Sequence, residues 1–153
     1  ISQHCSHTLT ERQLPPEAAH GVMAVNPGSW ALPGLVSDVP IIEFEVDGQQ
    51  VQVPDDGSNL LGTLRDYLDK RSAKDGCSPQ GQCGCCTVLI DGQPRVACVT
   101  PTRRVKGRSI TTLEGFSAEE RARWGGAFCA TGASQCGFCT PGIVVRLDAL
   151  DRK

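Results

Sequence analysis

Four cysteines that lie close together restrict this chain more than any other feature of its sequence. They are Cys77, Cys83, Cys86 and Cys98, within the run GCSPQGQCGCCTVLIDGQPRVAC. Three of them stand in a glycine-rich loop, and the fourth follows after eleven intervening residues and a predicted hairpin. A free cysteine usually acts as an isolated small hydrophobic residue, so this crowding favours four thiolates that wrap one inorganic centre.

The spacing of these cysteines is similar to that of plant-type ferredoxin loops. Those loops hold a 2Fe–2S cluster with C-x4-C-x2-C and a distant fourth cysteine, and here the spacing is C-x5-C-x2-C-x11-C. The extra residue in SPQGQ is expected to bulge outward without moving the thiolates. Gly76, Gly81 and Gly84 are expected to take positive φ and to bring backbone N–H groups against the cluster.

Alternating residues before the cysteine loop predict a first hairpin. IIEFEV, from Ile41, and QQVQV alternate apolar and polar residues, and Asp47-Gly48 between them suits a two-residue turn. A helix is expected to begin at Ser58, with one apolar face formed by Leu60, Leu64 and Leu68.

A second hairpin is predicted after the loop, with TVLI and RVACV on either side of Asp91-Gly92, and SITTL is expected to form a last short strand. The order hairpin, helix, cysteine loop, hairpin, strand is that of a β-grasp ferredoxin, in which a mixed sheet curls over one helix. We therefore expect an α+β chain with a β-grasp 2Fe–2S ferredoxin domain over residues 38–114. The agreement between periodicity and cysteine spacing supports both interpretations.

Residues 115–153 are predicted to form a second, helical unit. Its first helix begins with the capping box of Ser117 and Glu120, and is expected to run to Thr131.

A C-x-x-C pair, Cys136 and Cys139, precedes the last predicted helix, which has Thr140 as its expected N-cap and Pro141 in its first turn. The positive end of a helix dipole favours thiolates at this position. Taken alone, the pair suits half of a cluster site, a zinc knuckle or a thioredoxin-like dithiol. The dithiol interpretation requires a preceding strand, and a helix is predicted instead.

Together, GCSPQGQCGCCTVLIDG and the downstream GASQCGFCTPG resemble the iron–sulfur subunit, or N-terminal region, of the xanthine oxidase family of molybdenum hydroxylases. The resemblance covers residues from about 40 to 153. It implies that the ferredoxin-domain cluster is ligated by Cys77, Cys83, Cys86 and Cys98. It also implies that Cys136 and Cys139 supply half the ligands of a second 2Fe–2S cluster in an all-α helical domain, and that Gln135 lies beside the molybdopterin of a partner.

The function implied by this resemblance is that of an oxidoreductase component without substrate chemistry of its own. Such a subunit carries electrons from a molybdenum site through 2Fe–2S clusters toward a flavin or another acceptor. The implied partners are a molybdopterin-binding catalytic subunit or domain and an FAD-binding subunit or domain.

The chain departs from the family pattern in two further ways. The family completes its second cluster with a C-x-C farther downstream, and this sequence ends fourteen residues after Cys139. We therefore expect one complete cluster site and one half site, in a truncated helical unit whose last helix leaves an apolar face without packing neighbours: Ile143, Val144, Leu147 and Leu150. Cys85 stands where the family usually has alanine, and we interpret Cys5, Cys85 and Cys129 as non-ligands.

Two other functions compete with this one. A zinc-binding interaction module would use Cys83/Cys86 and Cys136/Cys139 as knuckles, but these pairs stand much farther apart than the roughly 15–20 residues common in zinc ribbons. A free-standing 2Fe–2S ferredoxin would not require the CGFCTPG half site.

Composition narrows the class of protein further. The net charge is −2 with scattered lysines and arginines, so nucleic-acid binding has no electrostatic footprint. Nine cysteines, an odd number, argue against a fully paired disulfide framework. No signal-peptide pattern or membrane span is evident, and a cytoplasmic location is expected. Residues 1–37 hold four of the ten prolines and are predicted to form an extended arm or linker.

Overall fold

Two hairpins and a short strand between them build one mixed sheet. The computed structural model describes residues 23–24 and 39–153, and its sheet has the strand order β1-β3-β2-β6-β4-β5. The strands are β1 (Met23–Ala24), β2 (Ile41–Val46), β3 (Gln49–Pro54), β4 (Thr87–Ile90), β5 (Gln93–Val96) and β6 (Ser109–Thr111). β2 pairs with β6 in parallel, whereas both hairpins and the β4–β6 pair are antiparallel.

Both predicted hairpin turns are confirmed. Asp47 and Gly48 have φ of 52° and 80°, and Asp91 and Gly92 have φ of 48° and 73°. Two successive left-handed residues are what the tight turn of a two-residue hairpin requires, and Asp-Gly tolerates them.

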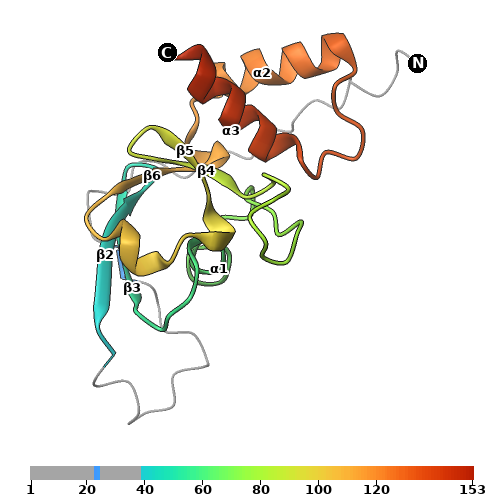
Figure 1. Cartoon of the computed structure of the whole chain (residues 1–153). Coiled ribbons are helices and arrows are strands. Elements are labelled where there is room, and N and C mark those ends of the chain that lie inside the picture. The colour runs from blue at the N-terminus through green and yellow to red at the C-terminus, as the bar shows by residue number, and fades with distance from the viewer. Residues whose placement is uncertain (1–22, 25–38) are drawn as a thin grey trace.

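The sheet bends around one short helical segment (Figure 1). It consists of α1 (Leu60–Gly62), which continues into a π-helical turn over Thr63–Tyr67. Leu60 and Leu64 are fully buried beneath the sheet, and Leu68 follows the turn and is partly buried. The prediction that Ser58 begins this helix is wrong by one residue, because the Asn59 side chain accepts the hydrogen bond from the Gly62 N–H at 2.9 Å.

The strand predicted from RVACV ends earlier than expected. β5 stops at Val96, and residues Ala97–Val99 form a 3-10 turn. The Ala97 N–H still donates to the carbonyl of Cys86 at 3.1 Å, and the Thr100 N–H then donates to the carbonyl of Ala97 at 3.2 Å. This second bond closes a turn that contains the buried Cys98.

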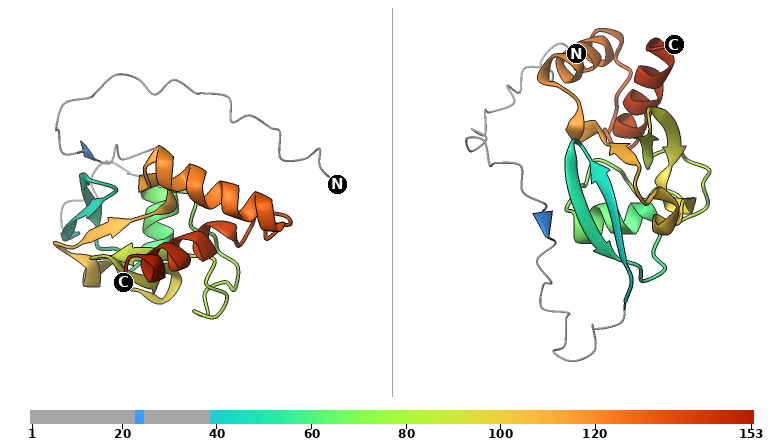
Figure 2. Two further views of the ribbon diagram at one scale, coloured as in Figure 1. Left: turned by 90° about the horizontal axis from the view of Figure 1, so that it is seen from above. Right: turned by 90° about the vertical axis from the view of Figure 1, so that its left-hand side faces the viewer.

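Two helices, α2 (Ala118–Thr131) and α3 (Thr140–Asp151), lie side by side on the side of the sheet away from α1 (Figures 1 and 2). The predicted capping box is confirmed: the Glu120 N–H donates to Ser117 Oγ, and the Ser117 N–H donates to the Glu120 carboxylate. The N-cap of α3 is Cys139, one residue before the predicted Thr140.

The prediction that the last helix lacks packing neighbours is wrong for its inner face. A second apolar cluster joins β4, the linker and both helices, with the members Leu89, Phe116, Val144, Val145 and Ala149. Ile143 and Leu150 remain 41% and 52% exposed on the outer face of α3. The buried face of α3 is thus formed by Val144, Val145, Asp148 and Ala149, and of the predicted apolar face only Val144 belongs to it.

A buried carboxylate, that of Asp148, also joins the two helices. Its Oδ1 accepts hydrogen bonds from the indole of Trp124 at 3.1 Å and from Arg123 at 3.3 Å. Its Oδ2 accepts one from Arg152 at 2.6 Å.

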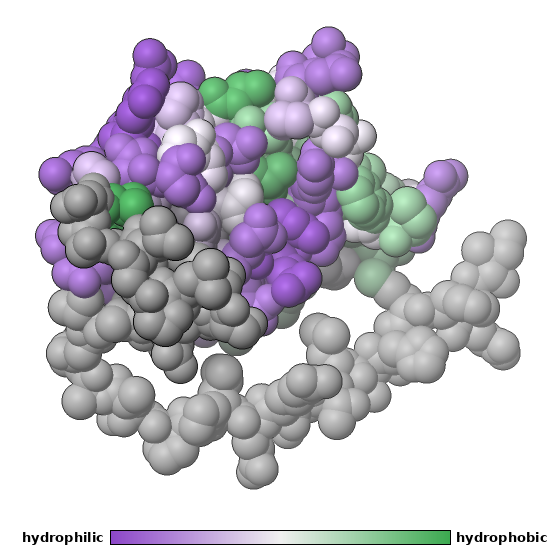
Figure 3. Space-filling model, turned by 90° about the horizontal axis from the view of Figure 1, so that it is seen from below, coloured by the Kyte–Doolittle hydropathy of each residue, from purple (hydrophilic) through white to green (hydrophobic). Residues whose placement is uncertain are grey.

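The surface of the described part of the chain is of mixed character. On the face seen from below, hydrophilic residues predominate and apolar residues form smaller groups (Figure 3). No helix among residues 23–24 and 39–153 has the length and apolar character needed to cross a membrane. Met23–Ala24 pairs in parallel with β3; the remainder of the predicted N-terminal arm lies outside the described residues.

Candidate metal centres

The loop before β4 brings the four predicted ligands of the first centre together as two pairs. Cys77 and Cys83 lie within hydrogen-bonding reach of each other, as do Cys86 and Cys98. Cys86 and Cys98 are buried, at 1% and 3% exposure, while Cys77 is partly buried and Cys83 exposed. One pair is therefore open to the surface and the other is enclosed by the core.

Backbone N–H groups point at the sulfur atoms of both pairs. The Gln80 N–H donates to Cys77 Sγ at 3.3 Å, and the Cys98 N–H donates to Cys86 Sγ at 3.4 Å. The N–H of Cys83, followed by those of Gln80 and Gln82, lowers the pKa of the Cys77 thiol to about 6. Such amide donors stabilise a thiolate over a thiol.

The Cys98 thiol has the opposite tendency. Burial raises its pKa to about 12, and the adjacent Cys86 contributes in the same direction. A metal that binds here must displace this proton, which makes binding dependent on pH.

Glycines in the loop make the close approach to sulfur possible. Gly81 and Gly84 have φ of +69° and +72°, which confirms their predicted left-handed conformation. The prediction of positive φ is wrong for Gly76, which is not among the left-handed glycines. A Cβ there would instead lie 3.0 Å from Cys83 Sγ and 3.2 Å from Cys85 Sγ. Residues 78–80, in the long first gap of the loop, are exposed.

These donors fit a two-iron centre better than a single ion. Two irons each require two thiolates, and four cysteines in two close pairs with amide donors to sulfur meet that requirement. Over the described ranges, no group of three or more His, Cys, Asp or Glu side chains is placed to hold one metal ion.

Cys85 is a third buried thiol of the loop, beside the four predicted ligands. It is 7% exposed and close to Cys83 and Cys139, and burial raises the pKa of its thiol to about 11. Cys129 lies on α2, and Cys5 falls outside the described residues.

The predicted second site lies in the connection between α2 and α3. Cys136 and Cys139 are both exposed there, and Gln135 is exposed beside them. The ring of Phe138, between the two cysteines, approaches to 3.3 Å from the position that a Cβ on Gly76 would occupy. The two predicted sites are therefore neighbours in space.

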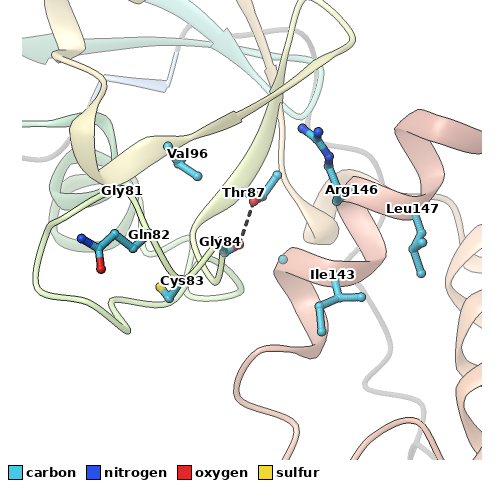
Figure 4. A pocket seen from close by; sticks show the side chains of 10 residues that line it. Gly81, Gln82, Cys83, Gly84, Thr87, Val96, Ile143, Arg146 and Leu147 are labelled. Carbon is cyan, nitrogen blue, oxygen red and sulfur yellow. Dashed lines mark hydrogen bonds between the residues drawn. The ribbon is translucent and has the colours of Figure 1, made fainter.

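A cavity of about 330 Å³ separates the cysteine loop from the outer part of α3 (Figure 4). One wall contains Cys83 and Gly84, and the facing wall contains Gly142 and Ile143. Thr87 Oγ1 donates to the carbonyl of Gly84 at 2.7 Å and fixes the loop wall. Sequence reasoning missed Gly142, although a glycine inside a helix, where propensity disfavours it, was an available signal.

Known proteins with similar sequences include components of several oxidoreductases. Residues 112–153 match the family model of a 2Fe-2S binding domain. The chain is 37% identical over 116 residues to the alpha chain of isoquinoline 1-oxidoreductase from Brevundimonas diminuta, an alignment that covers 74% of this chain and 75% of the relative. It is 41% identical over 113 residues to a nicotinate dehydrogenase subunit of Pseudomonas putida, with 71% and 70% covered.

Other relatives match over a smaller share of their length. A probable xanthine dehydrogenase subunit of Bacillus subtilis is 41% identical over 96 residues, which are 63% of this chain and 55% of the relative.

A solved structure has a similar fold as well as a similar sequence. The match to quinoline 2-oxidoreductase from Pseudomonas putida has a TM-score of 0.62 at 31% identity, and covers 74% of this chain and 71% of that chain. The aldehyde oxidoreductase of Desulfovibrio desulfuricans gives a TM-score of 0.64 at 38% identity, with 72% of this chain and 12% of that chain covered. The sequence, the fold and the paired cysteines together establish that this chain belongs to the iron–sulfur subunits of the xanthine oxidase family of molybdenum hydroxylases.

Proposed function

We propose that this chain transfers electrons, one at a time, from a molybdenum-containing partner toward a flavin or another acceptor. The observation that carries the proposal is the arrangement of four cysteines in two close pairs, with backbone N–H groups aimed at their sulfur atoms. The chemistry of the substrate belongs to the partner, because the described residues of this chain present cysteine ligands and no acid–base constellation around them.

In this proposal, residues 38–114 are a β-grasp ferredoxin-type domain whose cysteines hold one complete 2Fe–2S cluster. Cys77 and Cys83 ligate one iron, and Cys86 and Cys98 ligate the other, because each pair is already close. Cys85 is proposed not to be a ligand: its thiol is buried, and burial raises its pKa to about 11, although Cys83 is within its reach.

Residues 115–153 are proposed to form part of a helical 2Fe–2S domain. Cys136 and Cys139 supply half the ligands of its cluster, and the exposed Gln135 faces the molybdopterin of the partner. Residues 1–37 are proposed to form an arm that lies against a partner surface.

When bound, a 2Fe–2S cluster supplies a one-electron carrier. The chain contributes the rest through its own groups. The N–H groups of Gln80 and Cys98 donate to ligand sulfurs and so adjust the potential of the centre. The core around Cys86 and Cys98 excludes water from the enclosed pair, whereas exposed Cys83 gives the other pair access to the surface.

The proposed partners follow from the relatives, several of which are named as single subunits of dehydrogenases or oxidoreductases. A catalytic subunit or domain with molybdopterin and a subunit or domain with FAD would flank this chain.

Anaerobic assembly of the chain with iron and sulfide, followed by reduction with dithionite, tests this proposal. We expect a red-brown protein with the electron paramagnetic resonance signal of a reduced 2Fe–2S centre. A colourless protein that binds zinc would support the interaction-module alternative and contradict the proposal. Gel filtration with and without the co-produced molybdenum subunit separates a bound subunit from a free-standing ferredoxin, which would elute alone in both cases.

A further inference from the structure

The first turn of α3 lies directly on the cysteine loop, at a point where only glycine fits. A Cβ built on Gly142 would lie 2.3 Å from the carbonyl oxygen of Gly84 and 3.0 Å from Cα of Cys85. Real Cβ atoms do not approach backbone atoms as closely as 2.3 Å, and both contacted atoms belong to the backbone, which cannot rotate away as a flexible side chain does.

This contact joins the two cysteine sites. Gly84 and Cys85 stand between the proposed ligands Cys83 and Cys86, and Gly142 stands three residues after Cys139, the N-cap of the same helix. The second point of contact is the ring of Phe138 against Gly76, on the other side of the loop.

We infer that Gly142 is a positioning residue that sets the separation between the two iron–sulfur centres. This inference rests on the proposed function, because it assumes that both sites hold clusters in the assembled protein. The atoms nearest to a Cβ at Gly142 are backbone atoms of Gly84 and Cys85, and neither residue is a proposed ligand. Gly142 acts by allowing α3, which carries Cys139, to lie on the peptide that joins Gly84 to Cys85.

The size of the effect follows from the contact distance. A Cβ at 2.3 Å must retreat by roughly 1 Å to reach an ordinary van der Waals contact. The loop is fixed by the Thr87–Gly84 hydrogen bond at 2.7 Å, so the movement falls mainly on α3 and on Cys139. The magnetic dipolar interaction between the two reduced centres falls with the inverse cube of the distance between them. Electron transfer from one centre to the other also slows as that distance grows.

The experiment compares Gly142→Ala with Gly126→Ala in assembled protein that includes the remaining ligands of the second centre, with both centres loaded. Gly126 is a matched control, because it is also a helical glycine and a Cβ there meets nothing within 4 Å. The first measurement is the splitting that arises between the two reduced centres in low-temperature electron paramagnetic resonance. The second is hydrogen exchange at the amides of Cys85 and Cys86, which needs no second cluster.

We expect Gly142→Ala to narrow the splitting and to speed amide exchange in the loop, while Gly126→Ala leaves both as in the parent. A residue that only stabilised the fold would lower the unfolding temperature without changing the splitting of folded, fully loaded protein. Unchanged splitting and exchange in Gly142→Ala would therefore overturn the inference and leave the proposed function intact. A parent protein without any iron–sulfur signal would overturn the proposed function, and the inference with it.

If Gly142→Ala does not fold, Phe138→Ala tests the second point of contact between the two sites, that of Phe138 with Gly76. Phe138 is 46% exposed, so its removal costs little packing. It should again narrow the splitting, because the connection that carries both cysteines loses its contact with Gly76. A splitting equal to that of the parent would contradict the inference.

Discussion

Replacement of Asp148 by asparagine should destabilise the protein far more than the same change at Asp151, three residues along the same helix. Asp148 is fully buried, and its two oxygens accept hydrogen bonds from Trp124, Arg123 and Arg152. Asp151 is 52% exposed and pairs with Arg123 at 2.6 Å. Both variants thus lose a charge opposite the same arginine, but only one loses it from a buried position.

The magnitude can be worked from these contacts. A hydrogen bond to a buried charged group contributes about 1.5–3 kcal/mol. Asparagine keeps the volume, and its oxygen can still accept from Trp124 and Arg123, but its NH₂ group would face Arg152, which offers no acceptor. Since Arg123 and Arg152 are each 53% exposed and regain water, we discount the loss and expect about 2 kcal/mol for Asp148→Asn, against at most about 0.5 kcal/mol for Asp151→Asn.

Urea unfolding of both variants and the parent measures this difference. The midpoint should fall for Asp148→Asn with an unchanged slope, because the exposed surface on unfolding stays the same. Amide exchange in α3 should rise in the same variant, since Asp148 is the buried carboxylate of α3 that accepts hydrogen bonds from Trp124 and Arg123 of α2. If the two variants lose equal free energy, the carboxylate does not stabilise the pairing of α2 and α3, and the argument from burial is refuted.

Three further predictions concern the cysteine loop and its neighbourhood. Cys86→Ser should abolish the 2Fe–2S signal of the loop, because oxygen is a poorer ligand than thiolate for iron–sulfide cores, while Cys85→Ala should retain it; the reverse pattern in electron paramagnetic resonance would overturn the assignment. In the apoprotein, the alkylation rate of Cys77, measured by mass spectrometry, should level off above about pH 7, because a pKa of about 6 leaves this thiol ionised there. A rate that keeps rising to about pH 9 would contradict this prediction. Tyr67→Phe should cost about 1 kcal/mol at about pH 8, since the hydrogen bond to Asp56 raises the pKa of Tyr67 to about 12. That stabilisation is present below about pH 10 and is lost toward about pH 12, so the difference from the parent should shrink over this range in urea titrations.

The strands and turns of this chain could be predicted from local sequence because local chemistry determines them. Asp-Gly pairs tolerate two successive left-handed residues, and alternation on either side fixes which residues face the core. The cysteine spacing predicted the loop for the same reason, since thiols so close in the chain have few other arrangements. The positive φ values of Gly81 and Gly84 show that the sequence also predicted correctly where the loop requires glycine at these two positions.

Helix boundaries and helix packing depended on contacts that lie far apart in the sequence. Ser58 and Asn59 can both cap a helix, and Asn59 does so while Ser58 hydrogen-bonds to Thr63 and, through its carbonyl, to Thr102. Periodicity placed an apolar face on α3 but could not show that Asp148 would be buried, because a carboxylate is buried only when its partners, here on α2, are in place.

Different contacts determine the ligand arrangement of the first centre and the position of the second site relative to it. In the first centre, amides from residues 80–83 and 98 donate to nearby sulfurs, and none of these donors lies on α3. The relation between the two sites depends instead on α3, through the contact of Gly142 with Gly84 and the link of Asp148 to α2. A change at Gly142 should therefore alter the coupling between centres while the loop keeps its ligands, whereas a change at Cys77 should remove the first centre while α3 remains folded. In the combined variant the coupling should be absent, as in the Cys77 variant alone, because loss of the first centre leaves the second with nothing to couple to.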